Sequence, residues 1–247
     1  MMYTNEDAKQ FKKELKTLIH AERIHPKVMY VALKAVYGEI HDGTQTVSKS
    51  ATGNISYSSE ELEKVFHYLS PERLPNWKPY KLFIPALALY NGLRMSEACQ
   101  LQFENIVLLD GILCIRVEDN EETGATVKNL SCIRTIPIHP VILRLGFLKF
   151  IEDIKSGPLW PELAPDSPNK GYSYRFGMFF DHFNRKFVIQ DSTKSFHSLR
   201  FNFIEKKRSE PDAIVDYDFD IFAQTGIEPL SECEVAEQVK RFFNRPF

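Results

Sequence analysis

A run of apolar residues at positions 82–90 constrains the fold of this chain more than any other feature. Nearly every position is apolar, so a helix formed here has no polar side to turn towards water and must be buried. Asn91 and Gly92 then end the helix, and Arg94 follows them. A charge fixed at such a turn is half buried and needs an anionic partner. That partner is either a bound anion or a protein carboxylate such as that of Glu97.

A second polar feature lies in a predicted helix at positions 195–203. The imidazole of His197 and the guanidinium of Arg200 are three residues apart, so both project from one face. Leu199 and Phe203 lie on the other side and can pack into a core. A guanidinium binds phosphate or carboxylate through paired hydrogen bonds, and a nearby imidazole can donate to the same anion or transfer a proton. The pair therefore indicates a phosphate-handling site, with an ordinary surface pair as the alternative.

Overall charge restricts where a polyanion could bind. The 247 residues have a formal net charge of −2 and a pI of about 6.4, so any basic surface has to be local. The cysteines form no C-x-x-C pair and fit no zinc-binding spacing, so we expect reduced, buried thiols and no metal site. The cysteines are Cys99, Cys114, Cys132 and Cys233.

The N-terminus lacks the apolar stretch of a secretory signal, and no apolar run in the sequence is long enough to span a bilayer. We therefore expect a cytoplasmic protein with no membrane partner.

The N-terminal part of the chain is predicted to form a small separate unit. Apolar spacing predicts two short helices at 4–19 and 26–36, and serine, threonine, glycine and asparagine dominate the linker-like stretch at 44–57. We therefore predict an N-terminal helical segment with its linker at 1–53 and a larger domain at 54–247.

A small antiparallel sheet is predicted near the middle of the chain. Strand-like segments at 106–109 and 112–117 flank Asp110 and Gly111, and the Asp-Gly pair is typical of a type I′ hairpin turn. Positions 131–138 predict a third strand. The other periodic segments predict helices, so the fold class is α+β, mostly helical, with a three-stranded antiparallel sheet. These helices are expected at 58–69, 140–151, 174–187 and 231–242, the first and last beginning at capping boxes of Ser58 and Ser231.

Several segments, in this order, resemble the catalytic domain of tyrosine recombinases, the phage integrase family. The resemblance extends from about position 58 to about position 205 and implies a protein that binds double-stranded DNA. In this family, site-specific recombination and integration of mobile elements proceed by phosphodiester cleavage and strand transfer, without a metal or cofactor. The segments are at 90–101, 127–129, 133–140, 160–163 and 196–200.

The resemblance implies a role for each polar residue of these segments. Arg94 and Arg200 would bind the non-bridging oxygens of the phosphate, where charge builds in the transition state. Lys128, near the tip of the sheet, would be the general acid, and His197 an acid–base partner. Glu97 would orient a neighbouring group. Without the resemblance, Lys128 is an ordinary solvated edge charge.

The chain departs from the family after Arg200. Phe201 stands where family members usually have histidine, no later Gly-His or Gly-Trp pair follows, and no tyrosine occurs near positions 231–232, where the nucleophile is expected. Tyr217 is the only tyrosine beyond Arg200. The nucleophile is therefore Tyr217 on a rearranged loop, a tyrosine from another chain, or absent. Ser231 is interpreted as a helix cap and not as a replacement nucleophile.

Two further features bear on DNA binding. Acidic and apolar residues alternate at 213–222, which predicts a strand or an extended segment whose charge would repel a DNA backbone. Two helices at the N-terminus would make a smaller DNA clamp than the family's. Phe242 and Phe243 would pack within the chain or on a neighbouring protomer, as in a homo-oligomer on DNA. The hypotheses are a recombinase, a catalytically inactive DNA-binding regulator, and a degenerate integrase remnant.

Overall fold

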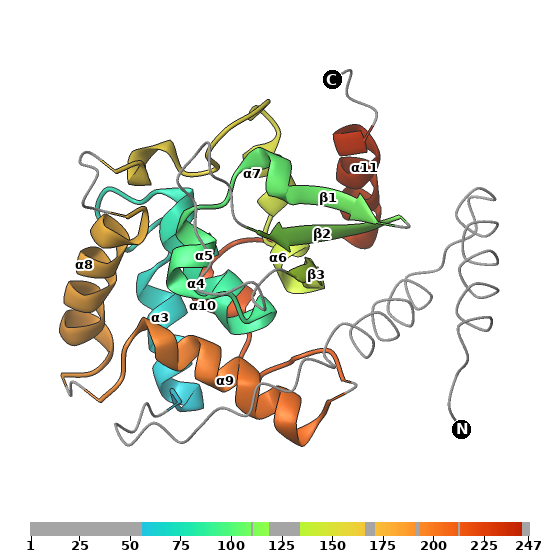
Figure 1. The fold of residues 1–247 in the computed structure, drawn as a ribbon. Coiled ribbons are helices and arrows are strands. Elements are labelled where there is room, and N and C mark those ends of the chain that lie inside the picture. The colour runs from blue at the N-terminus through green and yellow to red at the C-terminus, as the bar shows by residue number, and fades with distance from the viewer. Residues whose placement is uncertain are drawn as a thin grey trace.

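The computed structural model describes residues 56–109, 111–118, 134–165, 171–190, 193–211 and 213–243 (Figure 1). The helices predicted at 4–19 and 26–36 lie outside these ranges, so the domain division at position 53 stays a prediction. Lys128 and Cys132 also lie outside the described residues. The elements are α3 (Ser59–Tyr68), α4 (Pro79–Asn91), α5 (Met95–Cys99), η1 (Phe103–Asn105), β1 (Ile106–Leu109), β2 (Ile112–Val117), β3 (Arg134–Pro137), α6 (Pro140–Arg144), α7 (Phe147–Ile151), η3 (Pro161–Leu163), α8 (Ser173–Phe183), η4 (Asn184–Val188), α9 (Phe196–Ser209), α10 (Ile221–Thr225) and α11 (Glu232–Phe243).

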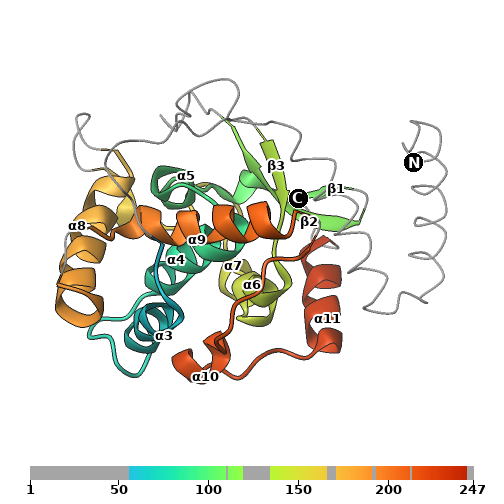
Figure 2. The ribbon, with the colours of Figure 1, turned by 90° about the horizontal axis from the view of Figure 1, so that it is seen from below.

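Helix α4 is the buried helix that the apolar run predicts. Each of its residues from Leu82 to Asn91 is buried, and Figure 2 shows α9 running along it, between α8 at one end and the sheet at the other. Gly92 ends α4 in the left-handed conformation, with φ of 66°. A Cβ atom at Gly92 would lie 2.4 Å from Cδ1 of Phe203. The close packing of α9 on α4 therefore requires glycine at this turn.

The sheet has the predicted order and pairing. β1 pairs with β2, and β2 pairs with β3, both antiparallel. The hairpin strands have the predicted bounds, and the third strand is described over Arg134–Pro137. The fold is therefore α+β with a small three-stranded antiparallel sheet. Asn91 joins the sheet to α4, because its Nδ2 donates to the Pro137 carbonyl at 2.7 Å.

The helix predicted at 140–151 is two helices. α6 ends at Arg144 and α7 begins at Phe147, because Gly146 between them adopts a φ of 88°, which interrupts a right-handed helix. The helix predicted at 174–187 forms as α8, and its last turns continue as the π-helical segment η4. The capping boxes of Ser58 and Ser231 are confirmed.

The alternating segment at 213–222 is not a strand. It runs without regular structure until Asp220 caps α10, although its side chains alternate as the sequence predicts. Asp216 is exposed, whereas Phe219 stacks on the core residue Phe66 with ring centroids 5.7 Å apart. The apolar residues are thus held by contacts with helices, so they need no neighbouring strand.

Helix α11 packs within its own chain. Phe242 is buried, and its ring centroid lies 5.5 Å from that of Phe103. Of the two alternatives drawn from the sequence, Phe242 therefore packs within the chain. The side chain of Phe243 is not described. The prediction of buried thiols holds for Cys99 and Cys114 but is wrong for Cys233, which is exposed on a surface face of α11. Within the described ranges, no helix has the length and apolar character to cross a membrane.

Candidate functional site

Arg94 is positioned by the N-terminus of α5. It is the N-cap residue, with extended backbone, and Glu97 occupies the third helical position. The Glu97 carboxylate accepts the Arg94 backbone N–H at 2.7 Å and its Nη1 at 2.7 Å, as in a capping box. The protein carboxylate predicted as one possible partner for Arg94 is therefore present. The Arg94 side chain is still 29% exposed, so an external anion can reach it.

Arg200 comes to the same turn from a distant part of the chain. It lies on α9, and its Nη1 donates a hydrogen bond to the carbonyl of Gly92, two residues before Arg94. The packing of Phe203 against Gly92 holds α9 at this position. The turn after α4 therefore contains Arg94 and accepts a hydrogen bond from Arg200.

His197 completes the cluster. It lies in the first turn of α9 with its side chain partly open to solvent. Partial loss of hydration, followed by the positive charges of Arg200 and Arg94, lowers the pKa of His197 below its usual value. Both arginines are thus close enough to act electrostatically on the imidazole. Arg94, His197 and Arg200, three of the four residues predicted to form the site, are brought together.

Arg134 is a residue of this cluster that the sequence analysis missed. Its Nη1 and Nη2 donate to the two oxygens of Glu97 at 3.0 and 2.8 Å, and Glu97 is only 3% exposed. Burial alone would raise the pKa of Glu97, but the hydrogen bonds and charges of Arg134 and Arg94 lower it to about 2. A signal for Arg134 was present, because it shares a strand face with Ile136, and a charge on an inward face requires a buried partner.

Trp160, in one of the segments that carry the family resemblance, contacts α5 from the core side. It is 1% exposed, and its indole Nε1 donates to the carbonyl of Ala98 at 2.7 Å. Because Ala98 follows Glu97 directly, this contact fixes the helix that holds the carboxylate. The site is thus supported by the core on the side away from solvent.

Tyr217, the candidate nucleophile, has its hydroxyl bound elsewhere. It donates to the carbonyl of Leu89 in α4 at 3.0 Å, and its ring packs edge-on against Tyr90. Burial, followed by the charges of Tyr90 and Glu205, raises the pKa of Tyr217. A hydroxyl with a raised pKa is a weak nucleophile. Lys206 Nζ lies 5.9 Å from the centroid of the Tyr217 ring, yet the balance of the described surroundings still raises the pKa of the hydroxyl.

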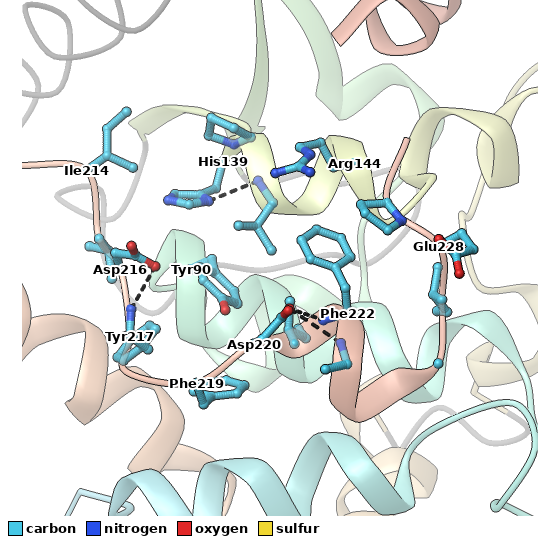
Figure 3. A pocket seen from close by; sticks show the side chains of 18 residues that line it. Tyr90, His139, Arg144, Ile214, Asp216, Tyr217, Phe219, Asp220, Phe222 and Glu228 are labelled. Atoms are coloured by element: carbon cyan, nitrogen blue, oxygen red, sulfur yellow. Dashed lines mark hydrogen bonds between the residues drawn. The ribbon is translucent and has the colours of Figure 1, made fainter. Parts of the chain in front are cut away.

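A cavity of about 890 Å³ lies beside Tyr217, between α6 and the segment that leads to α11 (Figure 3). None of the three arginines of the cluster lines it, nor does His197, whereas the carboxylates of Asp216, Asp220 and Glu228 do. His139 also lines it. Burial lowers the pKa of His139 to about 3, and its Nε2 has no hydrogen-bond partner within the described residues. Arg144 also lines the cavity, so three carboxylates face one guanidinium there, and the cavity is acidic overall and unsuited to phosphate.

Within the described residues, no group of three or more histidine, cysteine, aspartate or glutamate side chains could hold a metal ion. Lys128 lies outside those residues, so its place relative to the cluster stays a prediction.

No model of a known protein family matches the chain, and no curated protein or solved structure matches it either.

Proposed function

We propose that this protein binds double-stranded DNA as a member of the tyrosine recombinase, or phage integrase, type. The observation that carries the proposal is the meeting of Arg94, Arg200 and His197, which come from two helices far apart in the sequence. Two guanidinium groups and an imidazole at one partly open place suit a phosphodiester. The order of the sequence segments that resemble the family supports DNA as the source of that phosphate.

The cluster of Arg94, Arg200 and His197, called here the phosphate pocket, is proposed to bind the phosphate of DNA. Tyr217 is proposed not to cut the DNA. That hydroxyl is buried against Leu89, and its raised pKa opposes attack on phosphorus. Of the hypotheses drawn from the sequence, a catalytically inactive DNA-binding regulator therefore agrees best with the site. Strand transfer as a recombinase would need a tyrosine from another chain, with Lys128 as general acid.

Salt-dependent binding of a labelled DNA duplex, followed by fluorescence anisotropy, tests the proposal. Each phosphate contact adds close to one unit to the slope of log affinity against log salt. Arg94→Gln and Arg200→Gln should each weaken binding and reduce the slope by about 1. Arg241→Gln is the matched control, because Arg241 is 67% exposed on α11 and pairs with Glu237. Equal slopes for the wild type and the three variants, or no binding by the wild type, would exclude the arginine cluster as the DNA-binding site.

Covalent capture separates a regulator from a recombinase. The wild-type protein and Tyr217→Phe are incubated with nicked, labelled duplex DNA and resolved on a denaturing gel with mass spectrometry. We expect salt-sensitive binding and no adduct on Tyr217. An adduct that the Tyr217→Phe variant loses would show that this residue is a working nucleophile.

A further inference from the structure

The cavity beside Tyr217 is separate from the arginine cluster and has the size of a small-molecule site. Its volume of about 890 Å³ falls within the range of about 300–1,000 Å³ that is typical of such pockets. Its lining comes from Tyr90 of α4, from α6 with the preceding His139, and from residues between 214 and 229 (Figure 3). A ligand in this cavity would therefore lie between parts of the chain that are far apart in the sequence.

Tyr90 gives the cavity a buried polar atom. Its side chain is only 2% exposed, and its ring packs against the rings of His139 and Tyr217, with centroids 5.0 and 5.5 Å away. The hydroxyl of Tyr217 binds the carbonyl of Leu89, whereas the hydroxyl of Tyr90 forms no hydrogen bond with a described residue. A buried hydroxyl needs a hydrogen-bond partner, and the cavity that Tyr90 lines is the place from which one can come.

Carboxylates surround this hydroxyl. Burial, followed by the charges of Asp216 and Asp220, raises the pKa of Tyr90, so both carboxylates lie close enough to act on it. Together with Glu228 they line the cavity, and none of the three forms an ion pair with a described residue. Arg144 is the only cation among the described lining residues. The carboxylates therefore exceed the lining cations by two charges, and the cavity attracts positive charge.

The cations near the cavity have partners of their own. Arg144 stacks on the ring of Phe222, with its Cζ 5.0 Å from the ring centroid, and its Nε donates to the carbonyl of Leu230 at 3.3 Å. Lys206 lies over the Tyr217 ring, and Lys207 donates to the carbonyl of Ala213 at 2.7 Å. Neither lysine lines the cavity. A cationic ligand could thus approach the carboxylates without displacing these contacts.

We propose that this cavity binds a small organic amine, with its ammonium among Asp216, Asp220 and the Tyr90 hydroxyl. An ammonium donates up to three hydrogen bonds, which matches these acceptors, and apolar residues such as Ile214 and Phe219 line the cavity beside them. A metal ion fits less well, because no group of three or more histidine, cysteine, aspartate or glutamate side chains among the described residues could hold one. The site is independent of the proposed DNA binding.

The test compares three probes of one shape, which are phenethylamine, the uncharged phenethyl alcohol and the anionic phenylacetate. Binding is followed by the NMR shifts of the backbone amides of the protein. Phenethylamine should bind with a Kd of about 1 mM or tighter, and about tenfold more tightly than either analogue, because only the ammonium makes charged hydrogen bonds to carboxylates. The largest shifts should be at the residues that line the cavity.

Two variants and a matched control place the ammonium. Asp216→Asn should weaken phenethylamine about tenfold. Asp218→Asn makes the same charge change in the same exposed segment, but Asp218 does not line the cavity, so its affinity should stay within about twofold of wild type. Tyr90→Phe removes only the hydroxyl. It should weaken the amine severalfold and leave the melting temperature unchanged, because the hydroxyl forms no hydrogen bond with a described residue.

Three outcomes would overturn the proposal. The first is equal binding of the three probes, or no binding of phenethylamine at about 10 mM. The second is an Asp218→Asn variant as weak as Asp216→Asn, because the attraction would then be a general property of the acidic segment. The third is a short acetylated peptide with one lysine that shifts the same amides when phenethylamine does not, which would assign the cavity to the side chain of a partner protein.

Discussion

At the level of single residues, Glu97 connects the turn after α4 to strand β3, because Arg94 and Arg134 both donate to its carboxylate. A buried carboxylate is tolerated only when its charge is matched and its lone pairs are filled. Two guanidinium groups and a backbone N–H meet both needs. The pKa of about 2 for Glu97 is the consequence.

The acid stability of the protein should reflect this residue. A carboxyl whose pKa falls from 4.5 to about 2 on folding stabilises the folded state above its unfolded pKa, and this contribution is lost as the pH falls from 4.5 towards 2. The loss should be of the order of 3 kcal/mol. Urea unfolding of wild type and Glu97→Gln at pH 7 and pH 2.5 measures it. The two proteins should differ at pH 7 and converge at low pH; a difference independent of pH would contradict the assignment.

At the level of elements, the site depends on the contact between α4 and α9. Gly92 permits that contact for two reasons. It adopts the left-handed conformation that ends α4, and its missing Cβ leaves the space that the Phe203 ring occupies. The same residue accepts the hydrogen bond from Arg200. Packing and the proposed anion binding therefore depend on the same turn.

Gly92→Ala should be damaging for this reason. Strain in the left-handed region and the clash with Phe203 should lower the free energy of unfolding by about 1–3 kcal/mol and weaken DNA binding through Arg200. Gly177→Ala on α8 is the matched control, because its Cβ would meet Met95 Cε at 3.4 Å, an acceptable contact. Alanine inside a helix should stabilise the control by about 0.5–1 kcal/mol. Equal stabilities of the two variants in urea would show that Gly92 is not required.

At the level of the whole molecule, the predictions that succeeded depend on local rules. The hairpin at 106–117 follows from its Asp-Gly turn, and the capping boxes follow from side chains three residues apart. Gly146 was missed as a break between two helices, because the apolar spacing continues across it. The alternation at 213–222 predicted a strand or an extended segment; no strand forms there, and helices hold its apolar side chains.

The site was only partly predictable for a similar physical reason. The pairing of His197 with Arg200 follows from helical spacing. Their meeting with Arg94 depends on the packing of α9 against α4, which periodicity does not specify, and it was expected only from the resemblance. Arg134 was overlooked because its partner, Glu97, lies on another element and is identified only by the fold.

The titration of His197 tests most directly whether the cluster is a phosphate site. NMR of the imidazole ring, assigned with His197→Asn, gives its pKa with and without a DNA duplex. Loss of hydration is the largest cause of the lowered pKa, and the positive charges of Arg200 and Arg94 add to it. A phosphate between the two arginines would offset those charges, so the pKa should rise when DNA binds. An unchanged pKa for His197 in protein saturated with DNA would contradict the central claim, because DNA would then bind elsewhere.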